Sequence, residues 1–220
     1  MKMRVSFLGA LGLLVTLLPS GLLASSVEAV NFTGVTENTT NNSWSLGFQF
    51  TTNNAIDVTA LGFYDANQTD GSVGLGNCTG CGEVGIYNST GTLLVSAQVT
   101  TSGTLIGDFY FVPVATTLLA AGQTYYAVGE TGNADYTWDT TGFSVDPNIT
   151  YVTDAYVQSS VLAFPTGSDG LTQAGGGGYF GANFLESGAA TPEPSSFWLL
   201  GTGLLGGLAF WAKKRHGVRA

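Results

Sequence analysis

Apolar and polar residues alternate over short stretches along the middle of the chain. From Trp44 to Phe50 every second side chain is large and apolar, which places Trp44, Leu46 and Phe48 on one face. An alternation with period two is typical of a β-strand that buries one face. We predict further strands, rich in Thr, Val, Tyr and Phe, over residues 56–64, 82–87, 92–100, 107–114, 123–129, 148–157 and 178–185.

Turn-forming pairs such as Asn53-Asn54 and Ala121-Gly122 separate these stretches. Short strands joined by such turns favour an all-β fold, either an antiparallel β-sandwich or a jelly-roll-like arrangement. We assign it to residues 30–186, with one helical turn allowed within 114–121. Aromatic residues expected in or around its core are Trp44, Phe48, Phe50, Tyr87, Phe109, Phe111, Tyr125, Trp138, Tyr151 and Phe184. Neighbouring residues on a strand point to opposite faces. One aromatic residue of Tyr125-Tyr126 and one of Tyr136-Thr137-Trp138 should therefore be exposed unless something covers it.

The N-terminal end has a different pattern. Residues 1–29 combine two basic residues, Lys2 and Arg4, with an apolar run over 5–18 and small residues at the end. This order predicts a secretory signal peptide over residues 1–29, removed by signal peptidase after Ala29, with Ala24 as an earlier alternative. A retained membrane anchor is the other interpretation, although the apolar run is short for a bilayer span.

The C-terminal end carries a longer apolar segment. Residues 195–212 contain no charged side chain and would form a helix of about 27 Å, just enough to cross the hydrocarbon core of a bilayer. Basic residues occur within 213–219, and Lys213, Lys214 and Arg215 follow the segment directly. Because basic flanks stay cytoplasmic, we predict a single transmembrane helix in contact with membrane lipid, an external β-domain and a linker at 187–191.

Pro192-Glu193-Pro194, the apolar segment and the basic cluster occur in this order. Together they resemble the PEP-CTERM sorting signal of Gram-negative, exopolysaccharide-producing bacteria, a tail over residues 192–220 also known as an ice-binding-protein C-terminal domain. The resemblance implies that an exosortase, a membrane-embedded protease-transpeptidase, recognises Pro192, Glu193 and Pro194 and processes the tail. The protein would then be anchored transiently at the inner membrane and passed to the outer envelope or the extracellular matrix. A permanent C-terminal anchor is the alternative.

A second resemblance concerns the middle of the chain. The segments Leu61-Gly-Phe-Tyr-Asp65, Glu83-Val-Gly-Ile-Tyr87 and Ala121-Gly-Gln-Thr-Tyr125 are similar to uncharacterised β-sandwich domains that precede this sorting tail. It implies a fold but no activity.

Charge is distributed very unevenly. All six Lys and Arg residues lie at the two ends, whereas residues 30–190 carry 13 of the 15 acidic residues and no basic one. Such a stretch offers nothing to nucleic-acid phosphates. Without His or Lys it also excludes Ser-His-Asp and Cys-His catalysis, imidazole metal ligands and a P-loop. Carboxylate chemistry of the glycosidase type remains, with Asp108, Glu130, Asp135 and Asp139 as unranked candidates.

Two local motifs suggest binding or stabilisation. Cys78 and Cys81 are the only cysteines, and outside the membrane a structural disulfide is expected, with a redox-active pair as the alternative. Asp65, Asn67 and Asp70 share one loop and are candidate calcium ligands, although such residues more often form turns. No other cofactor is expected. Divalent cations would also relieve repulsion among the carboxylates and bridge them to exopolysaccharide.

These observations predict an exported, non-catalytic envelope or biofilm-matrix protein that acts by adhesion or scaffolding. The alternatives are a carboxylate-dependent glycan hydrolase or a carbohydrate-binding module. Ice binding is a third interpretation and would need a flat array of Thr side chains. We expect the stretches 31–43 and 167–178 to be flexible.

Overall fold

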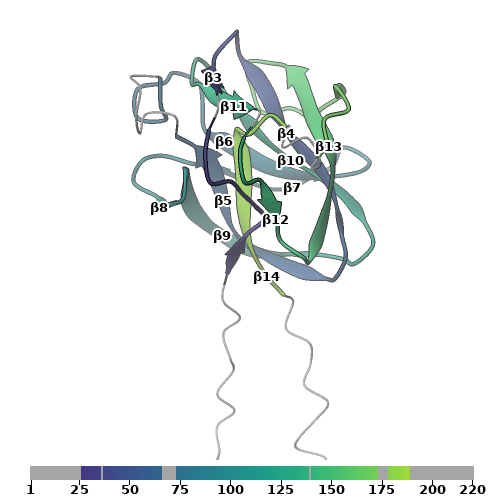
Figure 1. Cartoon of the computed structure of the whole chain (residues 1–220). Coiled ribbons are helices and arrows are strands. Elements are labelled where there is room, and N and C mark those ends of the chain that lie inside the picture. The colour runs from purple at the N-terminus through teal and green to yellow at the C-terminus, as the bar shows by residue number, and fades with distance from the viewer. Residues whose placement is uncertain (1–25, 36, 66–72, 139, 173–177, 189–220) are drawn as a thin grey trace, which may run out of the picture.

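The computed structural model of the chain describes residues 26–35, 37–65, 73–138, 140–172 and 178–188 (Figure 1). The sorting motif, the predicted transmembrane segment and nearly all of the predicted signal peptide lie outside these residues, as do Asn67, Asp70 and Asp139. The regular secondary structure in the described part consists of β-strands, and these residues contain no helix. A helix able to cross a bilayer is therefore not found among these residues.

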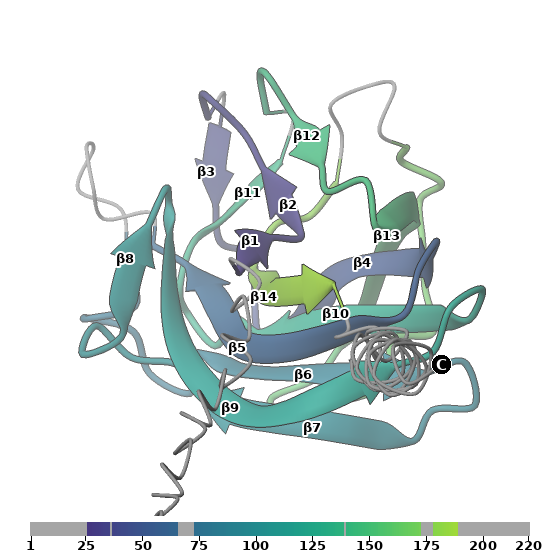
Figure 2. The same cartoon turned by 90° about the horizontal axis from the view of Figure 1, so that it is seen from below.

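The first of two five-stranded sheets is antiparallel throughout. Its strands follow the order β1 (Val27–Glu28), β14 (Ala182–Gly188), β5 (Ile56–Tyr64), β9 (Phe109–Leu119) and β8 (Thr104–Ile106). The sheet curls into a half-barrel, which Figure 2 shows from one end. As a result the turn after β8 approaches β1, and a Cβ placed on Gly107 would lie 3.5 Å from Glu28 Oε1.

The second five-stranded sheet packs against the first. Its order is β13 (Ile149–Gln158), β4 (Trp44–Thr52), β10 (Thr124–Glu130), β6 (Glu83–Asn88) and β7 (Leu93–Gln98). Two short antiparallel pairs complete the fold: β3 (Glu37–Thr39) with β11 (Tyr136–Trp138), and β2 (Val30–Asn31) with β12 (Ser144–Val145). The predicted all-β, antiparallel class is confirmed. The helical turn allowed within 114–121 is wrong, because β9 continues as a strand to Leu119.

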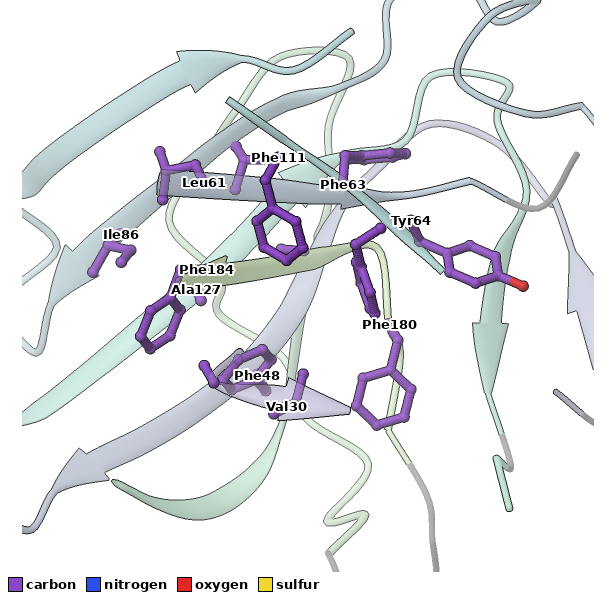
Figure 3. Packing of buried hydrophobic residues seen from close by; sticks show 14 of the residues in the cluster. Val30, Phe48, Leu61, Phe63, Tyr64, Ile86, Phe111, Ala127, Phe180 and Phe184 are labelled. Carbon is purple, nitrogen blue, oxygen red and sulfur yellow. The ribbon is translucent and has the colours of Figure 1, made fainter. Parts of the chain in front are cut away.

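Phenylalanines fill the space between the two sheets (Figure 3). Phe48, Phe63 and Phe184 have no exposed surface, and the rings of Phe48 and Phe184 stack with centroids 6.3 Å apart. Large aromatic side chains such as these dominate the energetics of a core. The expectation that Trp138 belongs to the core is wrong, because it lies on the short peripheral strand β11 and is 38% exposed. Tyr126 lies on the face opposite Tyr125 and is covered by Phe164, whose ring centroid is 5.0 Å from that of Tyr126.

The two ends of the β-domain lie side by side. Val27 is opposite Glu186, so β1 and the end of β14 meet at one end of the molecule (Figure 1). The Thr52 end of β4 is close to this region, because Asn148 pairs with the residues after Thr52 and its amide donates to Glu186 Oε1 at 2.8 Å. Trp44 therefore lies at the opposite end. The sheets extend from Val27 to Gly188, beyond the predicted limits of 30 and 186 on both sides.

Candidate functional site

A cavity of about 220 Å³ opens at the end of the β-domain that is remote from β1. It forms where β4 begins, where β13 ends, and where the chain enters β14. Its walls are largely aromatic, and its lining residues are Asn41, Trp44, Leu46, Tyr136, Tyr156, Asp169 and Tyr179. We refer to this cavity as the aromatic pocket.

The rings of the aromatic pocket hold one another in place. Trp44 meets Tyr156 edge to face with centroids 5.8 Å apart, and Tyr156 meets Tyr179 in the same manner at 5.8 Å. Tyr136 continues the series against Tyr179 at 5.9 Å. Edge-to-face contacts are the favoured geometry for aromatic pairs. The pocket therefore presents ring surfaces in a fixed arrangement.

Asp169 supplies the negative charge of the pocket. Its Oδ1 accepts a hydrogen bond from the Tyr156 hydroxyl at 2.8 Å, and its Oδ2 accepts one from the Tyr179 hydroxyl at 2.7 Å. The hydrogen bonds from Tyr179 and Tyr156 lower the pKa of Asp169. The hydrogen bond to Asp169 raises the pKa of Tyr156. Burial, together with the Asp169 carboxylate, raises the pKa of Tyr179. At neutral pH the pocket thus contains a carboxylate among neutral phenols.

Asn41 supplies the amide of the pocket. Its Oδ1 accepts hydrogen bonds from Trp44 Nε1 at 2.8 Å and from the Tyr136 hydroxyl at 3.1 Å. The next residue, Asn42, has a φ of 98°, a region that few side chains other than Asn, Asp and His adopt. Burial raises the pKa of Tyr136, so this hydroxyl stays a donor toward Asn41. The amide and the indole are therefore fixed relative to each other.

Asp154 positions the loop that carries Asp169. It lies on β13 with no exposed surface, and its Oδ1 accepts from Leu171 N at 2.9 Å and Ser168 Oγ at 3.1 Å. Its Oδ2 accepts from Asp169 N at 2.9 Å. Carboxylates that accept several backbone N–H bonds are strong local anchors. Within the described residues, Asp154 thus ties Ser168, Asp169 and Leu171 of the 167–178 stretch to β13.

A second cavity of about 400 Å³ lies between β1, β8 and β12. Glu28 and Asp146 both line it. Burial and the nearby Asp108 raise the pKa of Glu28 to about 7, against a hydrogen bond from Asn31. Glu186, which has no exposed surface, also has a pKa raised to about 7, first by burial and then by the neighbouring Asp146 carboxyl group, against the hydrogen bond from Asn148. Glu28 and Glu186 therefore ionise less readily than ordinary glutamates.

The predicted disulfide is present. Cys78 and Cys81 are joined, with their Cα atoms 6.1 Å apart. Neighbouring segments hold the short loop, since Thr79 N donates to Asn133 Oδ1 at 2.6 Å and Gln98 Nε2 donates to the Cys81 carbonyl at 2.7 Å. The bridge therefore fixes the chain as it enters β6.

The predicted calcium site is only partly within the described residues. Asp65 is buried, and its Oδ1 accepts a hydrogen bond from Leu75 N at 3.2 Å. Asn67 and Asp70, the other two candidate ligands, fall outside the described part, so calcium at this loop stays a prediction. Groups of three or more acidic, His or Cys side chains suited to a metal ion are absent from the residues that the structure describes.

The acidic residues singled out for hydrolysis have different surroundings. Asp108 raises the pKa of Glu28 through its charge, whereas Asp135 Oδ2 accepts from Val73 N at 2.9 Å. Glu130 is buried, and burial raises its pKa. None of these residues lines the aromatic pocket.

Sequence reasoning missed most of the aromatic pocket. It singled out Tyr136 as an aromatic residue of uncertain exposure, but not Tyr156, Asp169 or Tyr179. These three come from β13, a loop and the approach to β14, and only the pairing of the strands brings them together. A Tyr near the end of a predicted strand, followed by an Asp between two glycines, is the one signal that the sequence offered.

Comparisons with known proteins identify the end of the chain. Residues 190–215 match the family model of the PEP-CTERM protein-sorting motif, which confirms the sorting tail; the rest of the chain has no assigned family. This motif implies export, sorting to the cell surface and processing by an exosortase. No curated protein and no solved structure matches the chain.

Proposed function

We propose that this protein is a non-catalytic, adhesive component of the cell surface or extracellular matrix, and that its β-sandwich-type ectodomain binds one unit of a neutral saccharide chain. The sorting motif at residues 190–215 supplies the route of export. The aromatic pocket carries the binding part of the proposal. Attachment to exopolysaccharide in a biofilm is the setting that fits both.

The chemistry of the pocket suits a sugar ring. A pyranose has apolar C–H faces that pack on aromatic rings, and hydroxyl groups that need donors and acceptors at its edge. Trp44, Tyr156 and Tyr179 provide the ring surfaces, while Asp169 and Asn41 provide the polar contacts. Binding sites commonly combine an aromatic wall with a few fixed polar groups. At about 220 Å³ the pocket is smaller than the roughly 300–1,000 Å³ of drug-sized sites, which suits one sugar unit of a longer chain.

The charge of the domain narrows the class of saccharide. Asp169 is ionised, because its pKa is lowered, and no Lys or Arg occurs between Arg4 and Lys213. A uronic acid or sulfated sugar would meet uncompensated like charge in the pocket. Neutral hexose or N-acetylhexosamine chains are therefore the favoured ligands, and acidic polymers would need bridging divalent cations.

The position of the pocket supports a role at the surface. The sorting tail follows Gly188, at the end of the domain where β1 and β14 meet. The aromatic pocket lies at the opposite end, where β4 begins. A domain held through its C-terminal tail would direct the pocket away from the point of attachment.

Binding of neutral polysaccharides to the purified exported protein tests the proposal, by affinity electrophoresis and calorimetry. Trp44→Ala and Tyr179→Ala should each weaken binding by about 5- to 150-fold, since loss of one buried ring contact costs about 1–3 kcal/mol. Trp138→Ala is the matched control, because Trp138 is exposed but does not line the pocket. Equal binding by all four proteins, or no binding of any neutral polysaccharide, would contradict the proposal.

Hydrolysis is the rival function, and the second cavity is where it would occur. Retaining and inverting glycosidases use two carboxyl groups, one of them with a raised pKa. Glu28 has such a pKa and shares this cavity with Asp146. The aromatic pocket, in contrast, is lined by a single carboxylate, Asp169. Release of reducing ends that Glu28→Gln abolishes would favour the hydrolase over the binding protein.

A further inference from the structure

The last three residues of the predicted signal peptide, Val27–Ala29, are built into the fold. Val27–Glu28 forms β1 and pairs with Glu186 and Leu185 at the edge of the first sheet. The next residue, Ala29, has no exposed surface; its N–H donates to the Phe184 carbonyl at 2.9 Å, and its carbonyl accepts from Asp146 N at 3.0 Å. Residues 27–29 therefore satisfy backbone groups of two other segments, β14 and the turn at Asp146.

Val30 is held even more closely. It has no exposed surface, and the side chain of Asn183, also fully buried, bonds both of its backbone groups. Val30 N donates to Asn183 Oδ1 at 3.3 Å, and Asn183 Nδ2 donates to the Val30 carbonyl at 2.8 Å. The site is shaped for a neutral peptide N–H in the middle of a chain.

Cleavage after Ala29 is incompatible with this arrangement. It would turn Val30 N into a charged α-amino group at a buried position, where an amide oxygen is its hydrogen-bond acceptor, and burying an unpaired charge is strongly unfavourable. It would also remove β1 and expose the edge of β14, leaving an unpaired strand edge. Ser26, by contrast, is exposed.

We infer that signal peptidase cleaves between Ala24 and Val27, so that the mature protein keeps Val27–Ala29 as part of its first sheet. Ala24-Ser25-Ser26 supplies small residues of the kind that the peptidase reads at this place. Water adds across one peptide bond of this segment, releasing the signal peptide with a new carboxylate and the domain with a new amino group. The inference rests on the export that forms part of the proposed function, but not on saccharide binding.

N-terminal sequencing and intact mass of the mature protein from the producing bacterium test the inference. A first residue of Ser25, Ser26 or Val27 is expected. A first residue of Val30 would overturn it, while export itself would stand. Retention of Met1 would overturn both the inference and the prediction that the signal peptide is cleaved. Saccharide binding is tested separately and does not depend on this result.

An Ala24→Arg variant sharpens the test. A large basic residue one or three positions before the cut blocks signal peptidase, so the precursor should accumulate or the cut should move within Ala24–Val27. If the normal cut followed Ala29, five residues further on, Ala24→Arg would still give a mature protein that begins at Val30, and that result would overturn the inference. Leu8→Ile, within the apolar run, is the control for an altered signal peptide that keeps the small residues.

Discussion

Asp154 and Asp169 lie close together but differ in what surrounds them. Asp154 is fully buried and receives hydrogen bonds from the backbone of Asp169 and Leu171. Asp169 is exposed and receives its hydrogen bonds from two phenols of the aromatic pocket. One carboxylate therefore organises a loop, and the other is free on one side to meet a ligand.

Replacing Asp154 should affect stability and binding together. Asp154→Ala leaves the N–H groups of Asp169 and Leu171 without their acceptor, and we expect a loss of about 1–3 kcal/mol in the free energy of unfolding. Because the loop then loses its anchor, saccharide binding should weaken as well. Urea unfolding and calorimetric titration measure the two effects. Asp169→Ala removes the same charge from an exposed position, so it should weaken binding while changing stability by less than about 1 kcal/mol. Parent-like stability of Asp154→Ala would contradict this role.

At the scale of elements, the strands with clear alternation were predictable and the irregular ones were not. β5 was predicted at its observed bounds, Ile56–Tyr64, because its apolar residues and its flanking turns are both distinct. β1, β2, β3 and β12 have only two or three residues each, too few for a period to show. They form because neighbouring edges offer unpaired backbone groups, which is a property of the assembled sheets.

The same reasoning explains which part of the site was predictable. The Cys78–Cys81 bridge follows from residue type, compartment and close spacing in sequence. The aromatic pocket requires β4, β11 and β13 to meet at one end of the molecule, and the sequence contains no local record of that meeting. The helical turn allowed within 114–121 does not form for a similar reason, because pairing with β5 extends β9 to Leu119.

Close approach of β4 and β10 leads to a prediction about Gly47. A Cβ placed there would lie 2.0 Å from the Ala127 carbonyl oxygen on β10, a backbone atom that cannot move without separating the strands. Gly47→Ala should therefore destabilise the domain by about 1–3 kcal/mol, as overpacking does. Gly188→Ala is the matched control, since nothing lies within 4 Å of the added Cβ. Chemical unfolding of both variants gives the comparison, and equal stability would show that the two strands can separate at little cost.

For the whole molecule, the absence of basic residues between Arg4 and Lys213 has a consequence for every buried acid. A carboxylate in the β-domain cannot form an ion pair with Lys or Arg from the same domain. Only hydrogen bonds can therefore offset the cost of burying a carboxylate charge in this domain. Burial accordingly raises the pKa values of four acids, Glu28, Asp108, Glu130 and Glu186. The same charge distribution offers no basic side chain to nucleic-acid phosphates, and we expect it to make the stability of the domain depend on pH and on cations.

Stability should consequently fall as the pH rises from about 4.5 to about 7. Glu28 and Glu186 have pKa values raised to about 7 in the folded protein, while an unfolded chain ionises near the ordinary value. Between these limits the folded state binds more protons than the unfolded state, so raising the pH favours unfolding. After allowance for screening by solvent, we expect a loss of about 1–3 kcal/mol across this window. Urea unfolding at pH 5 and pH 8, at constant ionic strength, measures it.

The double variant Glu28→Gln/Glu186→Gln isolates the two groups responsible for this loss. Glutamine keeps the size of each side chain and cannot ionise, so the stability of the variant should change less between pH 5 and pH 8 than that of the parent. Each single variant should fall between them, because Glu28 faces Asp108 and Asn31 whereas Glu186 faces Asp146 and Asn148. The remaining slope would come from Asp108 and Glu130, whose pKa values are raised in the same direction. A double variant with the full slope of the parent would show that the loss of stability arises elsewhere, from the summed repulsion of the exposed carboxylates, and added salt would then reduce it.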